Sequence, residues 1–114
     1  MIELQGLTKT YAGTNVVDDV SLTLETGEFG VLIGPSGCGK STVLRMVAGL
    51  EDPTGGRLAL DGDEILGAGR DRGMVFQSYT SFDWLNVQEN VEYGMRLNGV
   101  AKSERRDRAS HFID

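Results

Sequence analysis

The sequence predicts an α/β fold with an antiparallel β subdomain at its N-terminus, and three observations lead to this prediction. Apolar and polar residues alternate over residues 2–7 and 16–24, which is the period of half-buried strands. A continuous, mostly apolar run over residues 29–33 is typical of a strand buried on both faces, as in α/β sheets. A glycine loop and then a helical pattern follow this run directly.

Length and composition limit what the chain can be. Its 114 residues allow one compact domain with a modest core. The formal net charge of −6 argues against a nucleic-acid partner, because such partners select clustered lysine and arginine. Cys38 is the only cysteine, so no internal disulfide can form, and no stretch approaches the about 20 apolar residues of a membrane span. We therefore expect a cytoplasmic protein.

The next elements follow from local signals in chain order. Residues 11–15 are expected to connect the first two strands, and the helical pattern over residues 40–50 stops at Pro53 and the glycines after it. Residues 57–60 and 73–76 are predicted to form two further strands, separated by glycine and charged residues.

The pattern of the sequence changes after Gln77. Residues 78–86 form a polar and aromatic loop, residues 87–97 have helical spacing, and another helix is expected from Ser103 onward. Asp114 follows this last pattern without a capping glycine or a polar tail, so we expect the chain to be a truncated one.

The glycine loop carries the strongest chemical signal. Its sequence matches the pattern G-x-x-x-x-G-K-[ST]. Gly34, Gly37 and Gly39 let the backbone wrap closely enough for several N–H groups to converge on a phosphate. The first turn of the following helix adds unpaired N–H groups and the positive end of the helix dipole. The candidate phosphate-binding residues are Gly34, Pro35, Ser36, Gly37, Cys38, Gly39, Lys40, Ser41 and Thr42.

Two side chains complete the chemistry expected of this loop. Lys40 would reach the β- and γ-phosphates as a mobile positive charge, and the Ser41 hydroxyl would coordinate a Mg²⁺ that bridges them. A glycine turn before a helix with a surface lysine is the alternative interpretation, and the apolar run immediately upstream argues against it.

The loop alone is shared by kinases, GTPases, recombination ATPases and transporters, so the flanking residues must distinguish these families. The flanking segments are Tyr11-Ala12-Gly13, Gly27-Glu28-Phe29, Ala48-Gly49-Leu50-Glu51, Pro53-Thr54-Gly55-Gly56 and Arg72-Gly73-Met74-Val75-Phe76-Gln77. Together they resemble the ATP-binding subunits of ABC transporters, from Ile2 to the end of the chain. The resemblance implies a P-loop NTPase with a RecA-like core, and ATP and Mg²⁺ as cofactors.

The resemblance assigns roles to two residues outside the loop. Tyr11 matches the aromatic residue that stacks on adenine; the alternative is that its ring only packs on the hairpin. Gln77 matches the glutamine that approaches Mg²⁺ and the attacking water. Lys40 and Gln77 are then the catalytic residues in this chain, and Ser41 and Gln77 are the metal ligands.

One stretch also resembles a particular branch of the family. Residues 78–91 look most like the ATP-binding subunits that energise import of nitrate, sulfonate or taurine. Phe82 and Trp84 within it are either core residues of a helical subdomain or anchors for a membrane permease, and both interpretations stay open. Gly30 stands where the family has a larger apolar residue, and Asp83 stands where this branch has proline.

The resemblance further implies how the chain is divided and what the protein does. Residues 1–77 correspond to the β subdomain and P-loop core, and residues 77–114 to the Q-loop and the start of a helical subdomain. The implied protein lies on the inner face of the cell membrane and couples ATP hydrolysis to import of a small solute. Its implied partners are transmembrane permease subunits, a second ATP-binding subunit and, indirectly, a periplasmic or extracellular solute-binding protein.

The sequence lacks several parts that hydrolysis requires in this family. These are the acidic strand end and adjacent glutamate of Walker B, the switch histidine, and a signature loop of the L-S-G-G-Q type. The alternative function is therefore nucleotide binding without hydrolysis.

Other residues that invite a functional interpretation are better explained by structure. His111 is expected on a helix surface. Asp61 begins an Asp-Gly turn, which is a better account of Asp61, Asp63 and Glu64 than a metal site. Arg105 and its neighbours alternate with acidic residues, which is typical of a solvated helical face.

Overall fold

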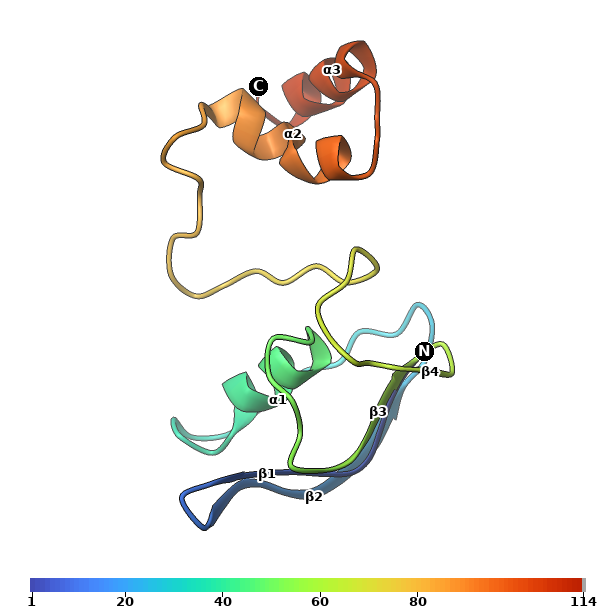
Figure 1. The fold of residues 1–114 in the computed structure, drawn as a ribbon, viewed down its shortest axis with the longest axis vertical. Coiled ribbons are helices and arrows are strands. Elements are labelled where there is room, and N and C mark those ends of the chain that lie inside the picture. The colour runs from blue at the N-terminus through green and yellow to red at the C-terminus, as the bar shows by residue number, and fades with distance from the viewer. Residues whose placement is uncertain (114) are drawn as a thin grey trace. The chain divides into compact units, whose positions relative to one another are not determined.

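The computed structural model describes residues 1–113, which separate into two compact units divided between Met74 and Val75 (Figure 1). The chain length allows one compact domain, and within it the described residues cluster into these two units. Residues 65–86, which contain this division, form no helix or strand. Among residues 1–113, no helix is both long and apolar enough to cross a membrane.

The first unit is a four-stranded antiparallel sheet with one helix. Its elements are β1 (Ile2–Tyr11), β2 (Thr14–Leu24), α1 (Lys40–Val47), β3 (Gly55–Leu60) and β4 (Asp63–Glu64). The strand order is β2-β1-β3-β4, and every neighbouring pair is antiparallel. The alternating patterns thus correctly predict the N-terminal antiparallel pair, and the strand predicted over residues 57–60 forms as β3. The helix ends earlier than its apolar pattern, because Gly49 adopts a left-handed conformation at φ 76°.

The hairpin between β1 and β2 is tighter than the sequence suggests. Tyr11 pairs with Thr14, so only Ala12 and Gly13 form the turn. Both have positive φ, 47° and 80°, which defines the turn type whose twist suits a two-residue hairpin. The turn between β3 and β4 has the same form, with Asp61 and Gly62 at 50° and 87°.

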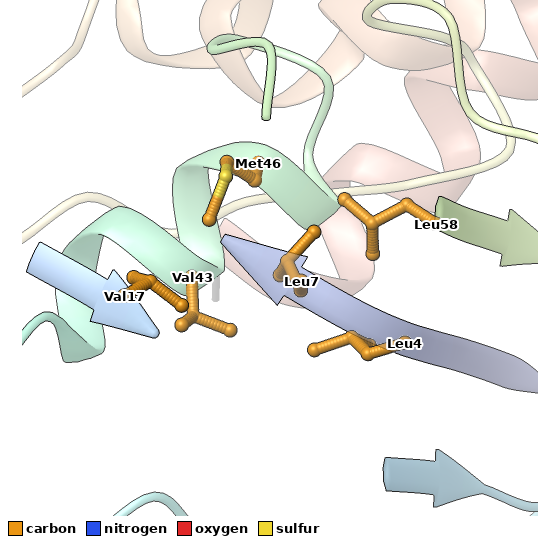
Figure 2. Close-up of a cluster of buried hydrophobic side chains, with 6 residues drawn as sticks. All are labelled: Leu4, Leu7, Val17, Val43, Met46 and Leu58. Atoms are coloured by element: carbon orange, nitrogen blue, oxygen red, sulfur yellow. The ribbon is translucent and has the colours of Figure 1, made fainter. Parts of the chain in front are cut away.

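The core of the first unit forms where α1 packs on the sheet (Figure 2). It consists of Leu4, Leu7, Val17, Val43, Met46 and Leu58. Two residues three apart on a regular strand point to opposite faces, yet Leu4 and Leu7 are both buried. An irregularity in the β1 register between them, with Gly6 at φ 57°, turns both side chains toward α1.

Two predicted strands do not form. Residues 29–33 and 73–76 are neither helix nor strand, and Phe29, Ile33 and Val75 are 90 %, 92 % and 98 % exposed. The apolar run predicted a strand buried on both faces, but within residues 1–113 no strand pairs with either segment. Such a strand depends on neighbours for its hydrogen bonds and for its burial, and a local pattern cannot supply them.

An apolar cavity of about 300 Å³ lies beside the first of these segments. It is lined by Ile2, Leu4, Leu22, Thr23, Leu24, Gly30, Val31, Leu32, Val43, Leu44 and Val47. A Cβ atom on Gly30 would lie 2.9 Å from Leu24 Cδ1. A larger residue at position 30 therefore requires the flexible Leu24 side chain to move into this space.

The second unit is a pair of helices, α2 (Val87–Leu97) and α3 (Lys102–Ile113), and their bounds agree with the sequence prediction within one residue. The Asn86 side chain and the Glu89 side chain cap the start of α2 reciprocally. At its end, Gly99 donates to the Arg96 carbonyl and Val100 to the Met95 carbonyl, with Gly99 at φ 77°. This is the Schellman arrangement, so both ends of α2 are fixed by local sequence.

A buried carboxylate joins the two helices. Glu92 accepts a hydrogen bond from Gln88 Nε2 at 2.9 Å and pairs with Arg105 Nε at 3.1 Å. The hydrogen bond from Gln88 and the charge of Arg105, acting against the raising effect of burial, lower the pKa of Glu92. Its contribution to stability is therefore complete above the unfolded-state pKa and is lost as the pH falls through the lowered folded-state pKa.

Replacing Ala12 by asparagine is expected to stabilise the first unit by about 0.5–1 kcal/mol, because asparagine tolerates the left-handed conformation better than alanine. Hydrogen exchange of the β1 and β2 amides should slow by about two- to fivefold. Ala12→Val is the opposing control, since a β-branched residue is strained at positive φ and should accelerate exchange. Equal exchange in both variants would contradict the assigned turn.

Candidate phosphate-binding site

The glycine loop leads directly into α1 within the first unit. Gly39 is the residue that caps the helix, and its carbonyl oxygen accepts the first helical hydrogen bond, from Val43 N at 3.0 Å. No side chain caps this end, and no acidic residue lies in the first turn. The N–H groups of the first turn and the positive end of the dipole are therefore available to an anion, as the sequence predicts for this loop.

Gly39 holds the loop close to the sheet. Its φ is 95°, and a Cβ atom at this position would lie 2.6 Å from the carbonyl oxygen of Val16 on β2. Gly37 also has positive φ, 81°, but a Cβ atom on Gly37 would meet nothing within 4 Å. Gly37 thus serves the turn alone, whereas Gly39 serves both the turn and the contact with β2.

The Lys40 ammonium group lies within the loop. Its Nζ donates hydrogen bonds to the carbonyl oxygens of Gly34 and Pro35, the second at 2.8 Å, and lies 3.6 Å from Cys38 Sγ. These partners are backbone and thiol groups, so within residues 1–113 no carboxylate neutralises the charge. The lysine is positioned to exchange carbonyl oxygens for the more strongly negative oxygens of a phosphate.

The two hydroxyl residues after Lys40 differ in accessibility. Ser41 is exposed, so its hydroxyl is open to a ligand. Thr42 is 5 % exposed, and its Oγ1 accepts a hydrogen bond from Arg45 at 3.4 Å. Oxygen ligands suit Mg²⁺, so Ser41 is the residue of the loop that fits a metal ion, while Thr42 has only its backbone N–H to offer a phosphate.

Tyr11 lies at the end of β1 and is 42 % exposed. Lys9 Nζ lies 5.2 Å from the centroid of its ring, donates to the Asp52 carbonyl at 2.6 Å and lies 3.7 Å from Glu51 Oε1. Glu51 in turn pairs with Arg45 on α1 at 3.2 Å. The ring is therefore linked through Lys9 and Glu51 to α1.

Lys9 and Glu51 were not identified by sequence reasoning. Lys9 stands two residues before Tyr11 on β1, and residues at this spacing lie on the same face of a strand. That spacing is the one signal the sequence offered for their contact. Nothing in the local pattern could have indicated Glu51, because it lies beyond α1 and meets Lys9 only through the fold.

An arginine whose role was not identified from the sequence stabilises the C-terminal end of α1. Arg72 donates to the carbonyl oxygens of Val47 at 3.0 Å and of Gly67 at 2.6 Å. A guanidinium group at this end of a helix satisfies an unpaired carbonyl and interacts favourably with the dipole. Arg72 thereby fixes the end of α1 opposite the glycine loop.

The remaining predicted residues lie elsewhere. Gln77 belongs to the second unit and is exposed, so the loop residues come together in the first unit without it. Asp61, which the sequence placed in a turn, pairs with the N-terminal ammonium group at 2.6 Å. Within residues 1–113, no group of three or more His, Cys, Asp and Glu side chains is arranged to hold a metal ion.

Comparison with known proteins identifies relatives over almost the whole chain. The family described as ABC transporter matches residues 17–114. The nitrate import ATP-binding protein NrtD of Synechocystis is 43% identical over 99% of this chain and 44% of its own length. The Fe(3+) ions import ATP-binding protein FbpC of Escherichia coli K12 is 43% identical over 98% of this chain and 33% of its own. The chain thus spans less than half the length of these curated relatives.

Solved structures agree with the sequence relatives. The ATP-binding cassette MJ0796, in a dimeric post-hydrolysis state bound to ADP and Pi, has a TM-score of 0.85 and 31% identity. The match covers 97% of this chain and 55% of that one. A structure titled as the ATP-binding subunit of an ABC transporter has a TM-score of 0.79 at 24% identity, covering 91% of this chain and 45% of that one, and supports the fold.

Gly39→Ala is expected to destabilise the first unit more than Gly37→Ala does. Both variants put a side chain at positive φ, which costs about 1 kcal/mol, but only the first also forces a Cβ atom against the Val16 carbonyl. Urea unfolding followed by far-UV circular dichroism would compare them. Equal loss of stability in the two variants would contradict the close contact between Gly39 and β2.

Proposed function

This chain belongs to the ABC transporter family, and from that membership we propose that its first unit binds the polyphosphate of ATP at residues 34–42. One observation supports the proposal above all: α1 begins without a side-chain cap, directly after a glycine loop that holds the Lys40 ammonium group. A helix end of this kind attracts an anion through its free N–H groups and dipole, and a lysine at the same place adds a full positive charge.

Different groups of the loop would contact different parts of Mg-ATP. The backbone N–H groups from Gly37 to Thr42 surround the phosphates, and Lys40 leaves its carbonyl partners for the β- and γ-phosphate oxygens. Ser41 supplies a hydroxyl to Mg²⁺, which in this family neutralises charge on the transferring phosphate. Lys40 acts as a catalytic residue in the parent protein because it stabilises charge that develops on the phosphate.

Two residues outside the loop are assigned by family resemblance. We propose that Tyr11 stacks on adenine with Lys9 holding its ring, which the 42 % exposure of the tyrosine and the 5.2 Å contact support. We propose that Gln77 contributes its side-chain oxygen to Mg²⁺ and to the position of the attacking water. Its exposure and its place after the apolar residues 74–76 support this role.

For the whole protein, we propose an ATP-binding subunit that couples ATP hydrolysis to import of a small solute. The named relatives import nitrate and ferric ions, and a relative from Rhizobium johnstonii, 48% identical over 94% of this chain and 30% of its own length, imports sn-glycerol-3-phosphate. These names support import, and their variety does not select one solute. We further propose that the solute is nitrate, sulfonate or taurine. This proposal rests on the resemblance of residues 78–91 and on the nitrate import relative.

The proposed partners and division of the chain follow from the same family. Permease subunits in the membrane, a second ATP-binding subunit and a solute-binding protein would complete the transporter, and the dimeric state named for MJ0796 supports the second subunit. The protein would lie on the inner face of the membrane. Residues 1–77 would act as the β subdomain and P-loop core, and residues 77–114 as the Q-loop and the first part of a helical subdomain.

A second candidate function applies to the 114 residues themselves. Their sequence contains no signature loop of the L-S-G-G-Q type and no acidic pair in the Walker B position. Phosphoryl transfer needs positioning and charge stabilisation together, so a chain without these groups would bind nucleotide and hydrolyse almost none.

Lys40→Ala is expected to weaken Mg-ATP binding by about 100-fold, because two charge-assisted hydrogen bonds to phosphate oxygens are lost. Isothermal titration calorimetry of the chain measures this directly. Lys102→Ala, which removes an equal charge from α3 in the second unit, is the matched control and should leave binding unchanged. Binding to Lys40→Ala that equals the control would refute the proposed site.

The same two variants test hydrolysis. The unmodified chain is expected to release no measurable phosphate from ATP. Phosphate release that survives stringent purification, persists in Lys102→Ala and disappears in Lys40→Ala would show that the chain hydrolyses ATP without further segments.

Tyr11→Ala is expected to weaken ATP binding by about 5- to 100-fold, the equivalent of about 1–3 kcal/mol for a base stack, whereas Tyr11→Phe keeps the ring and should retain binding. Comparing ATP with inorganic triphosphate separates the base from the phosphates, since triphosphate affinity should not change in either variant. Equal losses for both ligands would mean that Tyr11 supports the hairpin and does not contact adenine.

A further inference from the structure

The side chain of Asn90, on the first turn of α2, makes four hydrogen bonds to the loop before the helix. Its Oδ1 accepts from Phe82 N at 2.8 Å. Its Nδ2 donates to the carbonyl oxygens of Phe82 at 3.1 Å, Leu85 at 3.1 Å and Asn86 at 2.9 Å. One amide thus contacts both backbone groups of Phe82 and two further carbonyls. Because Nδ2 carries two hydrogens, one of them is shared between two of the three carbonyl oxygens.

These bonds hold the loop in place of regular secondary structure. Residues 82–86 form no helix or strand, so their backbone groups need partners from elsewhere. An asparagine amide presents an N–H donor and a carbonyl acceptor on one edge, so it pairs with both the N–H and the C=O of Phe82. The amide also lies on α2, so whatever it binds moves with that helix.

The positions of the aromatic residues in the loop depend on the same four hydrogen bonds of Asn90, which together we call the Asn90 anchor. The Phe82 ring lies 4.4 Å from the Tyr93 ring on α2 and 5.1 Å from the Trp84 ring, measured between centroids. Phe82 is half-buried and Trp84 is 78 % exposed. Of the two open interpretations, Phe82 therefore takes the role of a core residue of the second unit, and Trp84 remains at the surface.

The anchor shortens the connection between Gln77 and α2. Only the exposed residues 78–81 separate Gln77 from Phe82. With Phe82 fixed, the connection spans at most about 18 Å when fully extended; without the anchor it runs to Val87 and spans about 35 Å. A shorter connection restricts the volume that Gln77 explores and makes it follow movements of α2 more closely.

We propose that Asn90 is a positioning residue, which makes residues 82–86 one rigid body with α2 and thereby limits the reach of Gln77. The anchoring stands on the contacts within the second unit. Its consequence for catalysis rests on the proposed role of Gln77.

The test uses Trp84, the only tryptophan of the chain, as a probe of the loop. In Asn90→Ala, the fast component of Trp84 fluorescence anisotropy decay should grow, and the Phe82 amide should exchange its hydrogen about tenfold faster. Gln88→Ala is the matched control, because Gln88 is an amide on the same turn that contacts Glu92 and not the loop. It should leave both signals unchanged. Unchanged signals in Asn90→Ala, or equal changes in Gln88→Ala, would overturn the proposal.

Asn90→Asp separates the two functions of the amide and covers the case in which Asn90→Ala unfolds the helices. A carboxylate still accepts from Phe82 N but donates to none of the three carbonyl oxygens. The Phe82 amide should stay protected while Trp84 becomes more mobile, with helix content unchanged by circular dichroism. A Trp84 signal identical to that of the parent chain would overturn the proposal. Titration of the same variants with Mg-ATP tests the proposed nucleotide site separately from the anchoring by Asn90. If that site is wrong, the unmodified chain also fails to bind Mg-ATP.

Discussion

The contact between Gly39 and the backbone of β2 is the constraint on which the phosphate loop depends. A Cβ atom there would lie 2.6 Å from the Val16 carbonyl, so only glycine lets the loop approach the sheet this closely. From that point α1 runs over the sheet and buries Val43 and Met46 in one cluster with side chains of β1, β2 and β3. The antiparallel sheet is thus the support that sets where the first turn of α1, and with it the free N–H groups, can lie.

The second unit obtains its order by different means. Among residues 75–113, only Ala109 and Glu92 are more than nine-tenths buried. Apolar burial therefore contributes less to the second unit than to the first. Its helices are specified by caps at both ends of α2, by the Glu92–Arg105 pair and by the Asn90 amide. Polar contacts of this kind require defined geometry, and a unit held by them keeps a specific shape even with a small core.

Sequence reasoning succeeded where structure is decided locally. The alternation in β1 and β2, the spacing of α2 with its Asn98–Gly99 end, and the glycine loop before α1 are all short-range signals, and each led to a correct element. It failed for residues 29–33 and 73–76, because strand formation there depends on neighbours that no local pattern contains. It also missed Lys9, Arg72 and Asn90. Each of these side chains donates to backbone carbonyl oxygens. Because every residue has a backbone carbonyl, the sequence does not indicate which carbonyl lies next to a given side chain.

The position of Lys40 has a consequence for the thermodynamics of ligand binding. Because its ammonium group already bonds to the Gly34 and Pro35 carbonyls, the loop acts as an intramolecular competitor for that charge. A phosphate that binds must displace the loop's own oxygens, so the free energy of binding reflects an exchange of acceptors and not the full strength of a new ion pair. At the proposed nucleotide site, this competition would favour the multiply charged triphosphate over weaker anions that do not displace the two carbonyl groups.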